Sequence, residues 1–316
     1  MTENQKRLEK LWENKFELII AGGNEELVNK VKDFMKVLEE NKYHGMFKIP
    51  DEVYHLVPGI SKGQLDDFNE LPLKYYHKHF VEFNHEPTDP MKIGSMIHNA
   101  VLDPEGLANK YMSNSRIISG LKGEYKKPTS SNEYKDAKAN YEKSGYCVIS
   151  DSDYNMALDI SSKVLELESV KNIQEHGYTE VALFSIDTQT GLLKKQKSDG
   201  ILPANKIIWD LKSSSNAKID EFQKSIANFR YHVQAAYYLD IATEVLGGQF
   251  DKFAWTVAEK VKPYPIANYY CDEAALEKGR IEYRKNINEL ADCLEKDCFP
   301  SYSEEFEAIS IPHWAF

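Results

Sequence analysis

The sequence has no long apolar run and little cysteine. No stretch approaches the roughly 20 continuous apolar residues that a membrane helix needs, so we expect no membrane partner. The polar and charged residues 1–10 are followed by no apolar segment typical of a signal peptide. Four cysteines in 316 residues are too few for a disulfide scaffold. We therefore expect a protein of a reducing cytoplasm.

Positive charge is also in short supply. The chain has 39 Lys and Arg residues against 50 Asp and Glu residues, a net charge of −11. This balance argues against a surface coated in nucleic acid, because phosphate binding relies on Lys and Arg, but it permits a confined basic channel. With 42% hydrophobic and 28% charged residues the composition is that of a globular chain, which excludes a collagen, a coiled-coil rod and a disordered tail.

The chain contains no internal repeat and no low-complexity linker. Residues 1–44 predict two helices separated by Gly22-Gly23, and Gly45 interrupts the pattern after them. We expect residues 1–44 to form a helical N-terminal appendage and residues 45–316 to form the main domain.

The middle of the chain changes from helical to strand periodicity. Residues 113–131 are typical of a loop. The expected strands are residues 180–186, 192–199, 206–212, 253–259 and 265–271, and the expected helices around them include residues 132–143, 153–168 and 218–246. Strands followed by helices and again by strands indicate an α/β (α+β) fold with a central mixed β-sheet flanked by helices.

The pattern that carries chemistry lies on two of these strands. Asp210 and Lys212 alternate with apolar residues, so their side chains project to the same face. If the strand that ends at Asp199 pairs with theirs, two carboxylates and an ammonium meet at one point. Carboxylates hold a hard divalent cation, which polarises a phosphoryl oxygen and lowers the pKa of bound water, and a lysine neutralises developing negative charge. This is the D…(D/E)-x-K arrangement of nucleases with the restriction-endonuclease-like fold.

The same pattern has a plain alternative. Asp-x-Lys is common by chance, and a half-exposed strand with a cross-strand salt bridge would also carry it. Asp210 favours the nuclease interpretation, because an acid within the apolar strand IIWDL needs a partner such as a metal ion or Lys212.

Four more polar residues are candidates for the same site. Gln234 and Tyr238 lie four residues apart on one helix face, from which they would contact the scissile phosphate or the metal-bound water. The alternative is a packing helix with polar positions. His98 adjoins the apolar stripe of an earlier helix, where a structural histidine is the alternative to a metal ligand. Glu180 begins its strand, where a solvated carboxylate is the alternative.

Several longer segments share their order and spacing with one protein family. They are GISKGQLDDF (59–68) with Pro72, GSMIHNAVLDPE (94–105), EVALF (180–184), KSDGIL (197–202), IIWDLKSS (207–214), FRYHVQAAYYLD (229–240), FAWTVAEKVKPYPIANYY (253–270) and FPSYSEEFEAISIPHWAF (299–316). In these segments the chain resembles the RecE-type exodeoxyribonuclease VIII family of phages and prophages, within the PD-(D/E)XK nucleases. The similarity covers roughly residues 56 to 316.

The resemblance implies a metal site. Asp199 and Asp210 would be the carboxylate ligands of Mg²⁺ or Mn²⁺, His98 would be a further ligand, and the backbone carbonyl of Leu211 would complete the shell. An imidazole ligand is unusual for Mg²⁺, so Mn²⁺ would serve as well or better.

The resemblance also implies roles in catalysis. Lys212 would be the catalytic lysine, and Gln234 and Tyr238 match a Q-x-x-x-Y motif that positions substrate or water. Glu180 matches an acidic position before the core strands. One departure is Lys197, where relatives commonly have Arg in an Arg-Pro-Asp motif, so the fork geometry of Arg on a phosphate is lost.

Function and partners follow from the same resemblance. It implies a 5′-to-3′ exonuclease on the ends of linear double-stranded DNA, which leaves 3′ single-stranded tails for annealing-type recombination. It further implies a homo-oligomeric ring, a tetramer in the family, a RecT-like annealing protein as partner, and the cytoplasm of a bacterial host. An acidic exterior with a positive channel would fit the net charge of −11. The candidate channel residues, which are otherwise scattered solvated cations, are Lys194, Lys195, Lys197, Arg116, Lys122, Lys126 and Lys127.

Three other functions stay open at this point. An iron–sulfur recombination nuclease of the same fold has one cysteine before and three after the nuclease motifs, as here, but with closer spacing than Cys271, Cys293 and Cys298. A catalytically dead DNA-end-binding protein would not need both carboxylates and the lysine. A sequence-specific endonuclease would need a recognition domain larger than the N-terminal appendage.

Overall fold

The computed structural model describes residues 2–82, 88–303 and 305–313. The remaining residues, which include the end of the segment 299–316, lie outside this description. The chain divides into two compact units. Unit 1 comprises Met1–Asn84, Ala182–Gln196 and Leu276–Phe316, and unit 2 comprises His85–Val181 and Lys197–Ala275. Residue 44, the predicted domain boundary, therefore lies inside unit 1.

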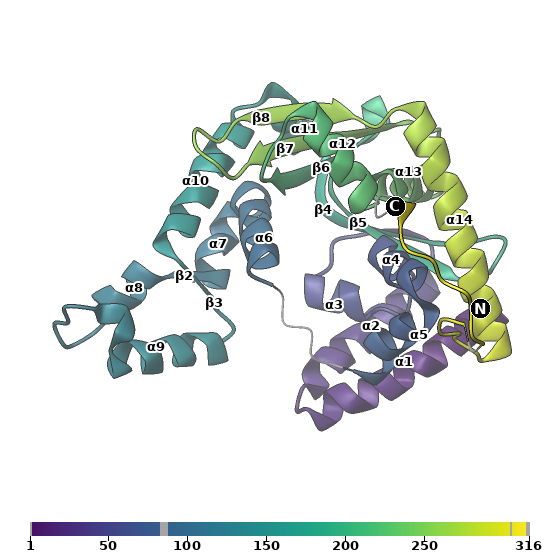
Figure 1. Ribbon diagram of the computed structural model, residues 1–316, viewed down its shortest axis with the longest axis horizontal. Coiled ribbons are helices and arrows are strands. Elements are labelled where there is room, and N and C mark those ends of the chain that lie inside the picture. Colours follow the sequence, from purple (N-terminus) through teal and green to yellow (C-terminus); the bar gives the residue numbers. More distant parts are fainter. Residues whose placement is uncertain (1, 83–87, 304, 314–316) are drawn as a thin grey trace. The chain divides into compact units, whose positions relative to one another are not determined.

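Unit 1 is mainly helical. The two helices expected in residues 1–44 are present, and Gly23 between them has a φ of 88°, in the region that glycine adopts readily. The elements of this unit are α1 (Glu3–Ala21), α2 (Glu25–Glu40), β1 (Gly45–Phe47), α3 (Asp51–Leu56), α4 (Lys62–Glu70), α5 (Pro72–Tyr76), the π-helical turn η1 (His77–Val81) and most of α14 (Glu273–Lys296) (Figure 1).

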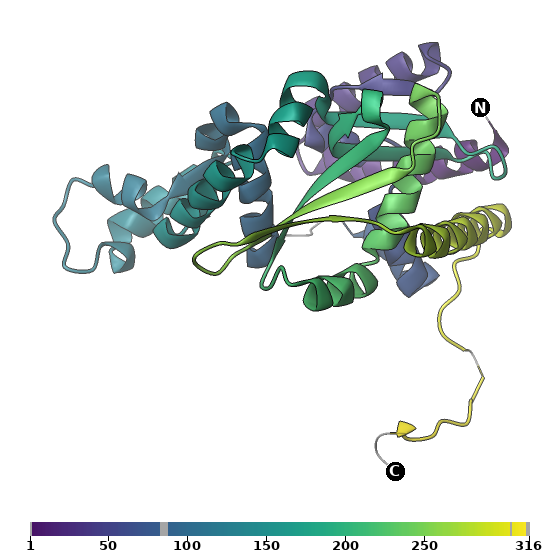
Figure 2. The ribbon, with the colours of Figure 1, turned by 90° about the horizontal axis from the view of Figure 1, so that it is seen from above.

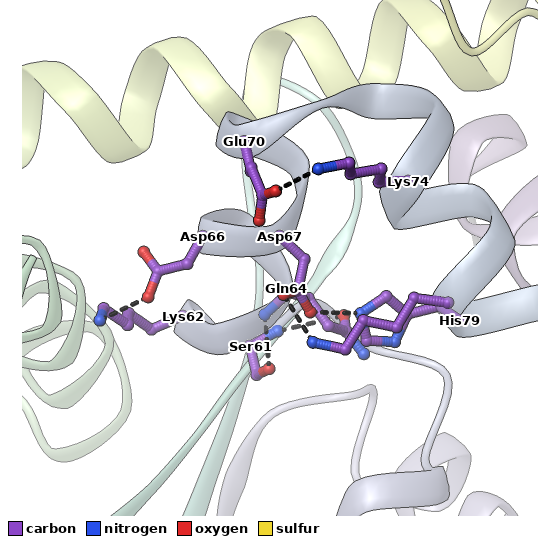
Figure 3. Close-up of polar contacts among 9 residues, drawn as sticks. Ser61, Lys62, Gln64, Asp66, Asp67, Glu70, Lys74 and His79 are labelled. Carbon is purple, nitrogen blue, oxygen red and sulfur yellow. Dashed lines mark hydrogen bonds and ion pairs between the residues drawn. The ribbon is translucent and has the colours of Figure 1, made fainter. Parts of the chain in front are cut away.

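Helix α4 begins with a capping box. The Ser61 side chain accepts a hydrogen bond from the Gln64 backbone N–H, and the Gln64 side chain accepts one from the Ser61 N–H, both at 3.4 Å. Figure 3 shows this box and the polar contacts around it, among them Asp67 and His79 at 2.8 Å. The box satisfies two backbone N–H groups that the start of a helix otherwise leaves without partners.

A six-stranded sheet has the strand order β1-β4-β5-β6-β7-β8. Strands β4 (Tyr178–Ile186) and β5 (Leu193–Leu202) contribute residues to both units, whereas β6 (Ile207–Ser214), β7 (Lys252–Glu259) and β8 (Ile266–Tyr270) belong to unit 2. Strand β6 pairs antiparallel with β5 and parallel with β7, so the sheet is mixed. The predicted α/β fold with a central mixed sheet is confirmed.

Unit 2 contains helices in addition to its part of the sheet. They are α6 (Asp89–Leu102), α7 (Pro104–Lys110), α8 (Asn114–Ser119), α9 (Asn132–Lys143), α10 (Asp151–Leu165), α11 (Glu168–His176), α12 (Ile219–Asn228) and α13 (Tyr231–Leu246), with 3₁₀ turns η2 (Pro128–Ser130) and η3 (Pro203–Asn205). Within the described residues of the chain, no helix is both long and apolar enough to cross a membrane.

The two faces of β6 meet different helices. Trp209 and Leu211 lie in an apolar core with residues of α6, α10 and α11. Asp210, between them in sequence, faces α13, where it accepts a hydrogen bond from Gln234. The alternation of a strand thus directs Trp209 and Leu211 to one layer of helices and Asp210 to the other.

Residues 104–150 form an arm of unit 2 with a small core of its own. Strand β2 (Tyr111–Ser113) pairs in parallel with β3 (Cys147–Ile149), and Met112, Ile117 and Tyr134 are buried beside them. Figures 1 and 2 show the arm extending away from β6 and β7. Helix α8 occupies part of the predicted loop, because the Ser113 hydroxyl caps its first turn, so that prediction is corrected.

The single helical stretch predicted for residues 218–246 is broken in two. Helices α12 and α13 are separated by Phe229 and Arg230, and Arg230 has a left-handed φ of 52°. Neither Gly nor Pro marks this position. The break turns the chain immediately before the face of α13 that meets β6.

Candidate active site

The register of β5 and β6 brings the two predicted carboxylates together. Gly200 pairs with Trp209 in the antiparallel ladder, so Asp199 and Asp210 are the next opposed positions. Oδ2 of Asp199 accepts a hydrogen bond of 2.8 Å from the Leu211 N–H, which holds the Asp199 side chain against the backbone of β6. The predicted pairing of these two strands is confirmed.

Asp210 is a buried acid held by two side chains. It is 5% exposed. Oδ2 lies 2.6 Å from Nζ of Lys212, and Oδ1 accepts a hydrogen bond of 2.7 Å from Nε2 of Gln234. The prediction that Asp210 and Lys212 project to the same face is confirmed. An acid buried this deeply needs both partners, because burial without them is costly.

His98 reaches the same site from helix α6. Its Nδ1 lies 3.3 Å from Oδ2 of Asp199, while its neighbour Ile97 is fully buried in the apolar core. A Cβ built at Gly94, on the same helix, would lie 3.7 Å from the Ser213 hydroxyl, so this part of α6 lies close against the end of β6. His98 therefore contacts a carboxylate instead of filling the core.

The pKa values of His98 and Asp199 are displaced in opposite directions. Burial acts to lower the pKa of His98, but the Asp199 carboxylate outweighs it and the pKa is raised. Burial acts to raise the pKa of Asp199, but His98 and Lys212 together outweigh it and the pKa is lowered. Both shifts favour an imidazolium beside a carboxylate.

Asp210 and Lys212 form the second pair. Burial raises the pKa of Asp210, against the opposing effect of Lys212. Burial acts to lower the pKa of Lys212, but Asp210 and its neighbours outweigh it and the pKa is raised, so the ammonium persists at neutral pH. Two adjacent carboxylates whose pKa values move apart are typical of catalytic sites.

One face of α13 completes the site. The Tyr238 hydroxyl is hydrogen-bonded to the Lys197 backbone and to the Gln234 side chain, and burial raises the pKa of Tyr238. Tyr231 lies under Lys212, with Nζ 4.7 Å from the ring centroid, in a cation–π contact. Sequence reasoning missed Tyr231. Its spacing of three residues from Gln234, on the same helix face, was the available signal.

Glu180 forms an ion pair with Lys197. Oε2 of Glu180 lies 3.0 Å from Nζ of Lys197, whose side chain is 14% exposed. Glu180 has a φ of 55°, a left-handed conformation inside strand β4 that costs on the order of 1–3 kcal/mol for a residue other than glycine. A catalytic role for Glu180 and a DNA contact of Lys197 stay predictions.

Lys194 and Lys195 do not line a channel in this structure. Each is 1% exposed. Nζ of Lys195 donates to the backbone carbonyls of Tyr54 at 2.8 Å and Val57 at 2.7 Å, and Nζ of Lys194 lies 3.6 Å from Asp187. The expectation that these two lysines contact DNA is therefore corrected: their ammonium groups are occupied within unit 1.

The basic residues of the arm are in a different environment. Arg116, Lys122, Lys126 and Lys127 are all exposed. Residues 110–143 carry eight Lys and Arg residues against four Asp and Glu residues, opposite in sign to the chain as a whole. DNA binding by these four residues stays a prediction.

The donor atoms around Asp199 and Asp210 fit a divalent cation in their chemistry. Two carboxylates are the ligands that Mg²⁺ and Mn²⁺ prefer, and an imidazole suits Mn²⁺. Among the described residues, no three His, Cys, Asp or Glu side chains are already placed at ligand spacing, since Asp210 faces Lys212. The Leu211 N–H donates to Asp199, and the role of the Leu211 carbonyl as a metal ligand stays a prediction.

Comparisons with known proteins support a PDDEXK-like nuclease fold for this chain. The sequence model of a family described as a PDDEXK-like domain of unknown function (DUF3799) matches residues 61–312. A solved structure from Eubacterium rectale, described as a "putative exonuclease", is 14% identical with a TM-score of 0.51, over 80% of this chain and 90% of that chain. A second structure, SSO0001, is 16% identical over 60% of this chain and 85% of that chain, with a TM-score of 0.25 that is too low to show a shared fold. No curated protein matches the chain.

Proposed function

Because the chain belongs to the PDDEXK-like domain family (DUF3799), we propose that it is a divalent-metal-dependent exonuclease acting on linear double-stranded DNA. The observation that supports this most is the contact of Asp210 with Lys212, at 2.6 Å, beside Asp199 on the paired strand. Family membership supports a nuclease, and the acid pair with its lysine supports an intact catalytic centre over a dead DNA-binding relative.

Each residue of the site has a chemical task in this proposal. Asp199, Asp210 and His98 would hold Mg²⁺ or Mn²⁺, which polarises a phosphoryl oxygen and lowers the pKa of water when bound. Lys212 keeps a positive charge beside Asp210, where negative charge develops on the phosphodiester. Gln234 fixes the orientation of the Asp210 carboxylate through its 2.7 Å hydrogen bond, so we assign it as a positioning residue.

Tyr238 and Glu180 both act on Lys197, two residues before Asp199. Tyr238 contacts the Lys197 backbone, and Glu180 contacts its side chain. These contacts fix the middle of β5, from which Asp199 projects. We assign Tyr238 and Glu180 to the placement of Asp199 in this proposal.

The direction of degradation, its product and its partner protein are proposed from the resemblance to the RecE-type family. We extend the proposal to degradation in the 5′-to-3′ direction, to 3′ single-stranded tails as the product, and to a RecT-like annealing protein that uses them. A homo-oligomeric ring, tetrameric by that resemblance, belongs to the same extension. The exposed cations of the arm, Arg116, Lys122, Lys126 and Lys127, are the candidate contacts to the DNA backbone.

The test compares one duplex in linear and closed-circular form, with a label on either end of each strand. We expect Mg²⁺ or Mn²⁺ to support degradation of the linear form only, with early release of label from 5′ ends, and a chelator to stop it. Equal cutting of the circle would make the protein an endonuclease. Early loss of 3′ label would reverse the proposed direction, and no cleavage in either metal would refute a nuclease.

A further inference from the structure

An exposed aromatic side chain stands at the break between α12 and α13. Phe229 is 59% exposed, and its ring is stacked on Tyr231, with ring centroids 5.5 Å apart and planes 29° apart. The left-handed Arg230 between them turns the chain so that the residues on either side of it stack. A large apolar ring at the surface is ordinary when isolated, but this one is the outermost member of an ordered group.

The group continues into the protein as a column of rings, defined here as Phe229, Tyr231, Phe222 and Tyr269. Tyr231 lies 6.1 Å from Phe222, and Phe222 is stacked on Tyr269 at 5.5 Å with planes 16° apart. Phe222 also contacts Trp255, which is 1% exposed, edge to face at 5.7 Å. The aromatic column is therefore anchored in the core, which gives its exposed end a fixed position.

The aromatic column is joined to the candidate active site. Nζ of Lys212 lies over the Tyr231 ring at 4.7 Å and at the same time 2.6 Å from Oδ2 of Asp210. A phosphate placed at Lys212 is thus one ring away from Phe229. The contacts of 4.7 Å and 5.5 Å place the Phe229 ring within about 10 Å of Nζ of Lys212, so the nucleotide whose phosphate lies at Lys212 is the one whose base can meet that ring.

We infer that Phe229 is the stacking surface for the unpaired nucleobase next to the scissile phosphate, on the strand being cleaved. This inference rests on the proposed nuclease function and adds a binding subsite to it. Every base has a π face, so an aromatic ring binds it without regard to sequence, as an exonuclease that moves along DNA requires. The edge of the ring makes no base-specific hydrogen bond, so the subsite holds a base in place without selecting it.

The first experiment removes the base instead of the protein side chain. Linear duplexes carry one stable abasic residue at the first, second or third position from the degraded end, in either the cleaved or the opposite strand. With the wild-type protein, we expect kcat/KM to fall about 5- to 100-fold at one position of the cleaved strand only, the range expected for one base–aromatic stack. Phe229→Ala should lower kcat/KM on intact DNA by a similar factor and remove the abasic effect. Phe229→Trp should retain the wild-type kcat/KM on intact DNA and the fall in kcat/KM on abasic DNA.

Controls separate this subsite from the nuclease activity itself. Tyr270→Ala removes a ring of unit 2 that is 66% exposed on the edge strand β8, and it should leave all substrates unaffected. If the wild type degrades DNA while Phe229→Ala keeps the same abasic effect, or if the effect lies on the opposite strand, the inference is overturned and the nuclease stands. If the wild type degrades no DNA, the proposed function and this inference fall together.

A second readout does not depend on cleavage. In chelator, a terminal 2-aminopurine on the cleaved strand should lose fluorescence on binding to the wild type and to Phe229→Trp, because stacking quenches it. Phe229→Ala should bind the same DNA with the quenching lost. Equal quenching in Phe229→Ala would assign the stack to another residue and overturn the inference.

Discussion

Strand β5 carries two groups of buried charge that have opposite kinds of partner. In unit 1, the Lys195 ammonium donates to backbone carbonyls of Tyr54 and Val57, and burial, with a smaller effect of Lys15, lowers its pKa well below the ordinary value. In unit 2, burial acts to raise the pKa of Asp199, but the charges of His98 and Lys212 outweigh it and the pKa is lowered. The buried charge of Lys195 is thus satisfied by neutral backbone carbonyls. The buried charge of Asp199 is compensated by the opposite charges of His98 and Lys212.

This difference separates a structural charge from a catalytic one. A lysine satisfied by backbone carbonyls gains nothing from a ligand, since every donor already has a fixed acceptor. Carboxylates paired with an ammonium and an imidazole can exchange those partners for a cation and a phosphate. We therefore expect substitutions in unit 2 to change the reaction rate and substitutions in unit 1 to change stability.

The largest expected effect is that of Asp210→Asn. This change keeps the shape of the side chain and removes its charge, so Lys212 and any divalent cation lose their partner. We expect the rate of DNA cleavage to fall about a thousandfold or more, since a bound cation contributes several kcal/mol to such a reaction. Initial rates on linear DNA measure it, with circular dichroism as the check on folding. A rate within tenfold of the wild type would remove Asp210 from the site.

Lys212→Ala should have the next largest effect. Loss of the ammonium removes positive charge beside the reacting phosphate, and we expect the rate to fall about 100- to 1,000-fold. DNA affinity, measured by fluorescence anisotropy in chelator, should change by less than about threefold, because the exposed cations of the arm supply backbone contacts. Loss of affinity in proportion to loss of rate would make Lys212 a binding residue only.

Lys195→Ala tests whether the buried charge of unit 1 contributes to stability and not to catalysis. It leaves buried carbonyls of Tyr54 and Val57 without their donor and creates a cavity, so we expect a loss of about 3 kcal/mol in the free energy of unfolding. The cleavage rate per folded molecule should stay within about twofold of the wild type. Denaturant unfolding and active-site titration measure the two quantities. Intact stability with lost activity would place Lys195 in the catalytic machinery after all.

The smallest expected effect is a pH dependence at Lys15. Burial lowers the pKa of Lys15 from 10.5 to about 8, so the folded chain binds this proton less tightly than the unfolded chain. The destabilisation is complete below pH 8 and is relieved as the pH rises towards 10.5. We expect Lys15→Met to raise Tm at pH 7, and the difference from the wild type to shrink between pH 8 and 10.5. A difference in Tm that is constant with pH would contradict the assignment.

Local patterns predict much of unit 2. Alternation places Asp210 and Lys212 on one face, and the apolar runs mark strands β4 to β8, because both depend on neighbours within a few residues. The three-residue strands β1, β2 and β3 are not predicted, because they are too short to show a period. The pairing that brings Asp199 to Asp210 follows from the short turn between β5 and β6. The arrangement of Asp199, Asp210 and Lys212 can therefore largely be predicted from the sequence.

Features that depend on contacts between segments far apart in the sequence cannot be predicted from local patterns. A lysine normally predicts exposure, and only the three-dimensional approach of Tyr54 and Val57 makes Lys195 a buried residue. The break at Arg230 is likewise missed, since a left-handed conformation at a residue other than glycine depends on its packing environment. Without that break, the contact of Tyr231 with Lys212 could not be placed.

The most direct test of the central claim is the position of manganese in a crystal of the wild-type protein. An anomalous difference map should show an ion about 2.2 Å from carboxylate oxygens of both Asp199 and Asp210, with Lys212 displaced from the bond it now makes to Asp210. An ion bound elsewhere, or Asp199 and Asp210 splayed apart in crystals that contain manganese, would contradict the account.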